Sequence, residues 1–134
     1  MKFIVSDTHF SHGKMIKGQS EWGFRDFKNV NEMNRTMITR WNRLIRKNDI
    51  VYHLGDFALC GKERKKEIVE SLNGKIILIR GNHDKGNQHN LDCGFKEIHE
   101  YLILGENKLI LSHWPICYGL PRLNVSVENW NYYP

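Results

Sequence analysis

Four short apolar segments, residues 3–5, 50–54, 75–80 and 109–111, are each followed at once by polar side chains. Short apolar runs bounded by polar or turn residues are typical of buried strands. The residues that follow are aspartate, histidine and asparagine, which bind metals or transfer protons. Ligands of an open α/β sheet bind at the carboxyl ends of its strands, so we expect these side chains to converge on one site.

Two helices are predicted between the first three strands. Asn29 with Glu32 three positions later resembles a capping box, and apolar residues follow at helical spacing: Val30, Met33, Met37, Trp41, Leu44 and Ile45. A second helix is expected over residues 62–72, ended by a left-handed turn at Asn73-Gly74. Its buried face would consist of Ile68, Val69 and Leu72. Both helices would pack on the sheet.

The order strand, helix, strand, helix, strand over residues 2–80 implies parallel strands joined by helical crossovers. The later apolar runs are expected to form strands with no helix between them, which gives an α/β fold with a strand-rich second half. With 134 residues the chain has the length of one domain, so we expect a single domain over residues 1–134.

Composition limits the kind of protein. Hydrophobic residues make up 40% and charged residues 26%, close to soluble globular averages, which argues against a disordered chain and a membrane protein. The apolar run at residues 3–5 is too short for a secretory signal, so we expect a cytoplasmic protein without a membrane partner. Cys60, Cys93 and Cys117 lack metal-site spacing and are expected to be reduced thiols.

The chain carries a formal net charge of +5, and four basic residues cluster on the helix predicted over residues 62–72. They are Lys62, Arg64, Lys65 and Lys66. Such a cluster attracts anionic partners, but a solvated helix face is the interpretation we favour. A nucleic-acid site on this helix has no recognition motif to support it. The sequence leaves the oligomeric state open.

The long loop predicted over residues 10–28 combines basic and aromatic side chains. These are Lys14, Lys17, Trp22, Phe24 and Arg25. They would suit a nucleotide-like phosphate ester, because cations bind phosphate and aromatic rings stack on bases. A hydrophobic flap over the first helix is an alternative of equal weight.

Five residues at the strand ends have the donor atoms of a metal site: Asp7, His9, Asp56, Asn82 and His113. Asp56 follows Gly55, where a residue without a side chain lets the backbone approach closely, and a carboxylate there can bridge two ions. This mixture of oxygen and nitrogen donors suits Mn²⁺, Fe or Zn²⁺ better than Ca²⁺. Each motif alone is a weak signal, but their joint occurrence after four strands indicates one site.

These residues fall into four motifs, Asp7-x-His9, Gly55-Asp56, Gly81-Asn82-His83-Asp84 and Ser112-His113. In order and approximate spacing they resemble the motif blocks of the calcineurin-like metallophosphoesterase superfamily, in particular its small stand-alone members. The resemblance implies a two-sheet β-sandwich flanked by helices, in four α/β/β/α layers. It also implies two metal ions bridged by Asp56, with Asp7 and His9 on one ion. Asn82 and His113 would hold the other.

By the same resemblance the chain would hydrolyse a phosphate ester, a diester in preference to a monoester, through a metal-activated water. Of the divalent ions we expect Mn²⁺, with Fe, Zn²⁺, Ni²⁺ and Mg²⁺ as alternatives. His83 would protonate the leaving oxygen or stabilise the phosphoryl charge, and Asp84 would hold the His83 ring in its working tautomer. Asn82, His12 and Arg25 would contact the substrate.

The sequence departs from the family pattern after Ser112-His113, where a Gly-His-x-His block is expected and none is present. The flanking residues match on both sides, which places a break between Gly119 and Arg122. The expressed protein could carry a further stretch there, which is the interpretation we favour. Otherwise five ligands and water would hold the two ions, with His12 as a substitute ligand to test. The missing histidines also leave open a catalytically inactive scaffold with this fold.

Overall fold

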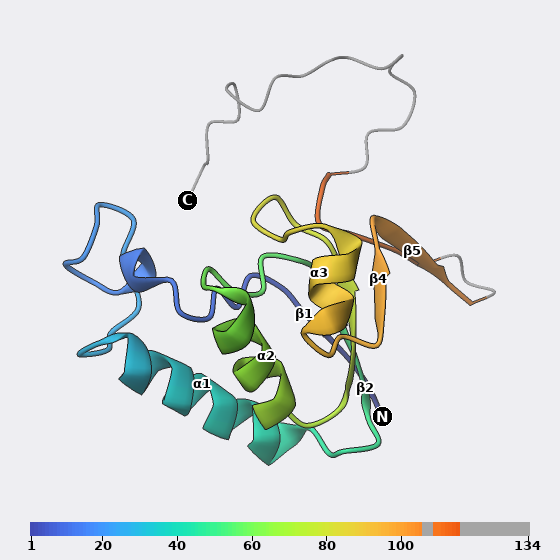
Figure 1. Cartoon of the computed structure of the whole chain (residues 1–134), viewed down its shortest axis with the longest axis horizontal. Coiled ribbons are helices and arrows are strands. Elements are labelled where there is room, and N and C mark those ends of the chain that lie inside the picture. Colours follow the sequence, from blue (N-terminus) through green and yellow to red (C-terminus); the bar gives the residue numbers. More distant parts are fainter. Residues whose placement is uncertain (106–108, 116–134) are drawn as a thin grey trace, which may run out of the picture.

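The structure, a computed structural model, describes residues 1–105 and 109–115 (Figure 1). Within them the strands are β1 (Lys2–Val5), β2 (Ile50–His53), β3 (Lys75–Ile79), β4 (Glu97–His99), β5 (Tyr101–Leu104) and β6 (Leu109–Ser112). The helices are η1 (Gly13–Met15), a single 3-10 turn, and α1 (Val30–Leu44), α2 (Lys62–Ser71) and α3 (Asn87–Asp92). The predicted break between Gly119 and Arg122 lies outside the described residues, as does Cys117.

Strands β1 to β4 form one parallel sheet, in which each strand pairs with the next along the chain. The register aligns their carboxyl ends: Val5 lies beside His53, and His53 beside Leu78. The sheet confirms the predicted parallel arrangement of the first three strands, with α1 and α2 in the connections. It thereby brings the residues that follow β1, β2 and β3 to the same edge.

In the second half one helix was not expected, whereas the second sheet agrees with the two sheets that the resemblance implied. Helix α3 lies between β3 and β4, where the sequence predicted strands only, because six residues are too few to reveal a hydrophobic period. Strand β6 pairs antiparallel with β5 in a separate two-stranded sheet. His113, which follows β6, therefore approaches the edge of the parallel sheet from a second sheet.

The parallel sheet is covered on both faces, which defines the layers. Val51, Ile76 and Leu78 join the main core with Trp41 of α1 and Ile68 of α2. The alternate residues of β2 and β3 form a second core with side chains of β5 and β6. Helices α1 and α2 accordingly lie across the parallel sheet from β5 (Figure 1). Helices, parallel sheet and antiparallel sheet are stacked as three layers.

Both long helices begin and end close to the predicted positions. The Asn29 side chain accepts the Glu32 N–H at 3.0 Å, and the Glu32 carboxylate accepts the Lys28 N–H at 2.7 Å, so the start of α1 is capped. Gly74, with φ of 98°, makes the left-handed turn after α2. No helix in the described part of the chain has the length and apolar character needed to cross a membrane.

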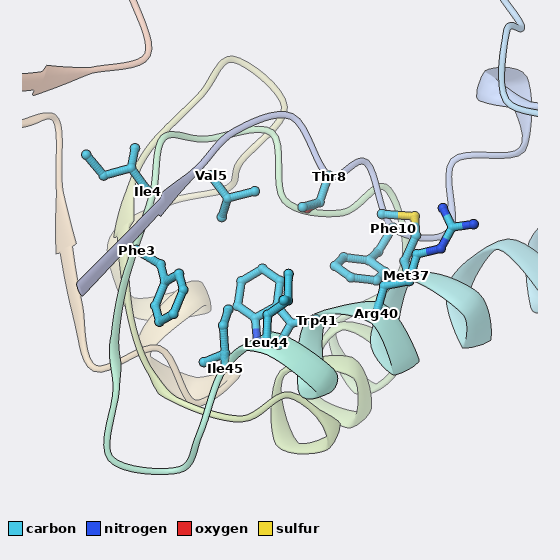
Figure 2. Close-up of a pocket in the computed structure, with 10 residues that line it drawn as sticks. All are labelled: Phe3, Ile4, Val5, Thr8, Phe10, Met37, Arg40, Trp41, Leu44 and Ile45. Carbon is cyan, nitrogen blue, oxygen red and sulfur yellow. The ribbon is translucent and has the colours of Figure 1, made fainter. Parts of the chain in front are cut away.

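An apolar pocket of about 320 Å³ lies between β1 and α1 (Figure 2). Phe3 and Val5 line it from β1, and Trp41 and Leu44 line it from α1. Leu44 belongs to the predicted apolar stripe but is 71% exposed, because it is the last residue of its helix. The described residues that line this pocket include no carboxylate, histidine or cysteine. The candidate chemistry therefore lies at the strand ends.

Candidate metal centre

The loops that follow β1 and β2 run side by side beyond the sheet. The Asp7 N–H donates to the Gly55 carbonyl at 3.0 Å, and the His9 N–H donates to the Asp56 carbonyl at 3.0 Å. Asp7, His9 and Asp56 have left-handed backbone, with φ of 53°, 47° and 54°. Aspartate and histidine are among the residues that adopt this conformation most readily. These sharp turns bring three predicted ligands together.

Asp56 lies between two groups of donor atoms. On one side, His9 Nε2 lies 3.6 Å from Asp56 Oδ2 and 3.6 Å from Asp7 Oδ1. On the other side, His113 Nε2 lies 3.9 Å from Asp56 Oδ1 and 3.1 Å from Asn82 Oδ1. Donor atoms of Asp7, Asp56 and His113 also lie within 4.8 Å of one another. The two oxygens of Asp56 therefore face different donors, an arrangement suited to two cations.

The surroundings of His113 show that a cation fits this centre. Its Nδ1 lies 2.8 Å from the Leu54 carbonyl oxygen, an acceptor, so Nδ1 carries the proton. Nε2 then faces the Asn82 amide at 3.1 Å and Asp56 Oδ1 at 3.9 Å. The contact with Asn82 is satisfied either by a hydrogen bond from the amide nitrogen or by a cation shared with the amide oxygen. Asp56, Asn82 and His113 are therefore positioned to hold a divalent ion.

Gly55 and Gly81 leave room for the Asp56 carboxylate. A Cβ atom on Gly81 would lie 2.3 Å from Asp56 Oδ1, and one on Gly55 would lie 2.5 Å from the Gly81 nitrogen. Gly55 also has φ of 95°, where side chains are strained. The His83 N–H donates to Asp56 Oδ1 at 2.9 Å. Close backbone contact thus fixes the carboxylate that two ions would share.

His9, His12 and His83 form a cluster beside the centre. The Nδ1 atoms of His9 and His12 lie 3.1 Å apart, and the His83 ring centroid lies 5.7 Å from that of His9 and 6.3 Å from that of His12. Burial lowers the pKa of His9, against the attraction of the Asp56 and Asp7 carboxylates. Burial also lowers the pKa of His12, and His9 adds to that shift. Both shifts favour neutral rings with lone pairs available.

His83 lies between this cluster and open space. Its side chain is 43% exposed, and its Nε2 lies 3.8 Å from Asp56 Oδ2. It lines an open groove of about 720 Å³ together with His12, Gly13, Lys14, Gln19 and Leu59. The predicted acid therefore borders both the metal donors and a space that a substrate can enter.

Asp84 is buried, and among the described residues its bonding partners do not include the His83 ring. Its Oδ2 accepts the N–H of Asp56 at 2.8 Å and that of Gly81 at 2.9 Å. Its Oδ1 accepts the N–H of Phe57 at 3.2 Å. Because both oxygens bind backbone, Asp84 joins two loops of the centre, which differs from the tautomer-fixing role that the sequence predicted.

Arg25, predicted to contact substrate, is bonded within the fold. Its Nη1 donates to the Thr8 carbonyl at 2.6 Å and its Nη2 to the Asp7 carbonyl at 3.0 Å. Arg25 thus clamps the left-handed loop, and its contact with substrate stays a prediction. Trp22 and Phe24 are 74% and 70% exposed, so these two rings do not form the hydrophobic flap considered from the sequence.

His53 is a buried polar residue that the sequence did not single out. Its Nδ1 accepts the Gly55 N–H at 3.2 Å, and its Nε2 lies 2.9 Å from the Thr8 hydroxyl oxygen. Burial lowers the pKa of His53 to about 3, although the Asp84 carboxylate opposes the shift. The neutral ring joins the two loops that follow β1 and β2. The only indication of this role in the sequence was the position of His53 on a short apolar segment expected to form a buried strand.

Lys65 was assigned to a solvated helix face, and for this residue the assignment is wrong. The residue is 1% exposed, and its Nζ lies 3.9 Å from Asp84 Oδ1. Its position three residues before Ile68 and seven before Leu72 puts it on the buried stripe of α2. This helical spacing could have predicted that Lys65 is buried, but its charge alone suggested that it is exposed.

The fold and the donor set define an α/β protein with a candidate metal centre at the strand ends. The sequence model of the calcineurin-like phosphoesterase family matches residues 3–133. The chain belongs to this family, which confirms the resemblance drawn from the four motifs.

Two curated relatives and one solved structure resemble the chain. An uncharacterized protein of Methanocaldococcus jannaschii is 51% identical over 85 residues, 62% of this chain and 46% of that protein. The glycerophosphodiester phosphodiesterase GpdQ of Enterobacter lignolyticus is 31% identical over 84 residues, 60% of this chain and 28% of that protein. The crystal structure of AQ665 of Aquifex aeolicus, a protein of unknown function, matches with a TM-score of 0.66 and 32% identity, over 86% of this chain and 61% of that one. The chain spans less than half the length of these curated relatives.

Proposed function

We propose that the chain hydrolyses phosphate esters with two divalent metal ions, and that its substrate is a phosphodiester. Membership of the family supports phosphate-ester hydrolysis in general. The position of Asp56 carries the proposal, because Oδ2 faces His9 at 3.6 Å and Oδ1 faces His113 at 3.9 Å. A carboxylate with imidazole donors on both sides is suited to bridging two ions.

Each ion would take three protein ligands. Asp7, His9 and Asp56 would hold one, and Asn82 and His113 would hold the other with the second oxygen of Asp56. Mn²⁺ is our first choice because carboxylate, amide and imidazole donors suit it, with Fe, Zn²⁺, Ni²⁺ and Mg²⁺ as alternatives. Ions bound in this way polarise phosphoryl oxygens and lower the pKa of water, so that a nucleophile forms near neutral pH.

His83 is the residue placed to move a proton. Its Nε2 lies 3.8 Å from Asp56 Oδ2, and its side chain is 43% exposed beside the groove. Its own N–H is bonded to Asp56 Oδ1 at 2.9 Å, which fixes its backbone against the centre. A proton on the ring can therefore be given to the leaving oxygen of an ester lying in the groove. A positioned acid typically contributes about 10²–10⁴-fold to the rate.

The groove beside His83 supports a diester. A diester keeps a second alcohol group that needs space next to the centre, and the groove of about 720 Å³ supplies it. His12 and Lys14 line the groove and would contact the ester, while Asn82 would meet the phosphoryl group from the other side. One relative, GpdQ, is named as a glycerophosphodiester phosphodiesterase, which favours the same choice.

The four-layer α/β/β/α architecture is part of the same proposal. Three layers are seen in the described residues: helices, the parallel sheet, and the sheet of β5 and β6. The fourth layer, helices on the outer face of the second sheet, is drawn from the family. Assigning the whole chain to a single metallophosphoesterase domain likewise remains a proposal.

Hydrolysis of bis-p-nitrophenyl phosphate and of p-nitrophenyl phosphate, with and without Mn²⁺, tests the function. We expect Mn²⁺-dependent turnover with the higher kcat/KM for the diester. Asp56→Asn weakens the shared ligand and should cost at least the roughly 10–100-fold that loss of a supporting residue costs a metal site. Asp26→Asn is the matched control, because this exposed aspartate lies outside the centre.

His83→Ala separates proton transfer from metal binding. It should bind Mn²⁺ as wild type does, by calorimetric titration, while turnover falls by about 10²–10⁴-fold. Absence of turnover of either ester with any of the five candidate metals would refute the proposal. Two alternatives would then remain, a catalytically inactive scaffold with this fold or an enzyme specialised for another ester.

A further inference from the structure

Lys65 of α2 is a lysine enclosed in the protein behind the candidate metal centre. Its Nζ lies 3.9 Å from Asp84 Oδ1 and 3.3 Å from Asn90 Oδ1. The side chains of Lys65 and Asp84 are 2% and 0% exposed, and Asn90 is fully buried. Lysine is almost never fully buried without a partner, so this position requires its charge to be compensated.

The carboxylate that compensates Lys65 is the one that joins the loops of the centre. Asp84 accepts the N–H groups of Asp56, Phe57 and Gly81, at 2.8, 3.2 and 2.9 Å. Asp56 would bridge the ions, and Gly81 directly precedes the ligand Asn82. The position of Asp84 therefore sets the spacing between the loops after β2 and β3.

The second partner of Lys65 reaches the other end of the same turn. Asn90 of α3 donates from Nδ2 to the Lys85 carbonyl at 2.6 Å and to the Gly86 carbonyl at 3.2 Å. Through Asp84 and Asn90, Lys65 is connected to both sides of the segment that carries His83. An apolar side chain would fill the same volume but provide neither connection.

We propose that Lys65 is a positioning residue of the metal centre, which acts through Asp84 on the loops that carry Asp56 and Asn82. Lys65 holds the Asp84 carboxylate in place, so that its three backbone bonds stay formed. It touches neither metal nor substrate. The part of this inference that concerns metal affinity rests on the proposed function, whereas the part that concerns the loops does not.

Lys65→Met removes the charge and keeps the length of the side chain. Calorimetric titration should give an Mn²⁺ affinity lower by about 10–100-fold, the range for residues that support metal ligands. Lys65→Arg, which keeps the charge, should lose less Mn²⁺ affinity than Lys65→Met. The matched control is Lys66→Met in the same helix, since the Lys66 side chain is 54% exposed and pairs with Glu70 at 3.8 Å. It should bind Mn²⁺ as wild type does.

Amide hydrogen exchange of the metal-free protein gives a readout that does not depend on any metal. In Lys65→Met the amides of Asp56, Phe57 and Gly81 should exchange at least about 10-fold faster, while those of β2 keep wild-type protection. If wild type binds none of the five candidate metals, the proposed function fails and the exchange rates still decide the role of Lys65. Wild-type exchange together with wild-type Mn²⁺ affinity in Lys65→Met would overturn the inference.

If Lys65→Met does not fold, a double variant that removes the charges of both Lys65 and Asp84 still tests the inference. The double variant Lys65→Met/Asp84→Asn should then exchange no faster at Asp56 and Gly81 than Asp84→Asn does, because Lys65 acts only through Asp84 and the double variant leaves no buried charge unpaired. It should also bind Mn²⁺ no more weakly than Asp84→Asn does. A further loss in the double variant would show that Lys65 acts by another route and would contradict the inference.

Discussion

Gly81→Ala tests directly whether close backbone packing against Asp56 shapes the metal centre. A Cβ at position 81 would lie 2.3 Å from Asp56 Oδ1, 2.6 Å from the Asp56 nitrogen and 2.9 Å from His113 Cε1. Gly81 does not have a positive φ, so alanine meets no backbone strain and the effect is steric. All three contacts involve predicted metal ligands.

The size of the effect follows from how far the carboxylate must move. Ordinary contacts begin at 3.4 Å, so Asp56 Oδ1 has to shift by about 1 Å. Metal sites hold their ligand distances to about 0.2 Å, and a shift of about 1 Å in a reacting group costs roughly 10²-fold in rate. We therefore expect Gly81→Ala to lower kcat for the diester by about 10²-fold. Overpacking should cost about 1–3 kcal/mol of stability.

The assay is Mn²⁺-dependent hydrolysis of bis-p-nitrophenyl phosphate, with urea unfolding beside it. Gly86→Ala is the control, because nothing lies within 4 Å of a Cβ at that position. It should turn over as wild type does and lose at most about 1 kcal/mol as a weaker helix cap. Wild-type turnover and Mn²⁺ affinity in folded Gly81→Ala would show that the Asp56 position is not critical and would refute this reasoning.

Two further substitutions test the groups around the centre. The pKa of His53 is about 3 in the fold against 6.5 unfolded, so only the unfolded chain gains its proton between these values. Wild type should therefore lose about 2 kcal/mol more stability than His53→Gln between pH 7 and pH 5 in urea unfolding, and equal losses would contradict the burial argument. Arg25→Lys replaces two nitrogens held in a rigid fork, one on the Thr8 carbonyl and one on the Asp7 carbonyl, by a single ammonium group, so unfolding free energy should fall by about 1–3 kcal/mol with KM unchanged. A raised KM at unchanged stability would instead identify Arg25 as a substrate contact.

The features predicted well from the sequence depend on neighbours along the chain. Asn29 and Glu32 cap α1 as expected, and Gly74 makes the left-handed turn after α2. The parallel sheet follows from the alternation of strands and helices. The structure also brings Asp7, His9, Asp56 and Asn82 to one place, because the carboxyl ends of adjacent parallel strands share an edge, and His113 joins them from the end of β6 in the second sheet.

The features that were missed depend on partners distant in sequence. Charge predicted exposure for Lys65, but its side chain binds groups inside the protein. The bonds of Arg25 to the Asp7 and Thr8 carbonyls were not predicted either. The role of Asp84 was inferred from its neighbour in the sequence, His83, whereas its hydrogen-bond partners include Asp56 on another loop. Helix α3 has too few residues to show a period. The partners of a polar side chain depend on the folded structure and cannot be predicted from its neighbours in the sequence alone.

The left-handed backbone at Asp7, His9 and Asp56 limits which substitutions can be accepted at these three positions during evolution. A left-handed residue costs about 1–2 kcal/mol for most side chains, and aspartate, asparagine and histidine are, apart from glycine, the types enriched there. Selection for folding alone would therefore retain ligand-type residues at these positions in a lineage that had lost its metals. Asn82 and His113 have no positive φ. Among homologues that have lost the activity, Asn82 and His113 should therefore be the first ligand positions to be substituted.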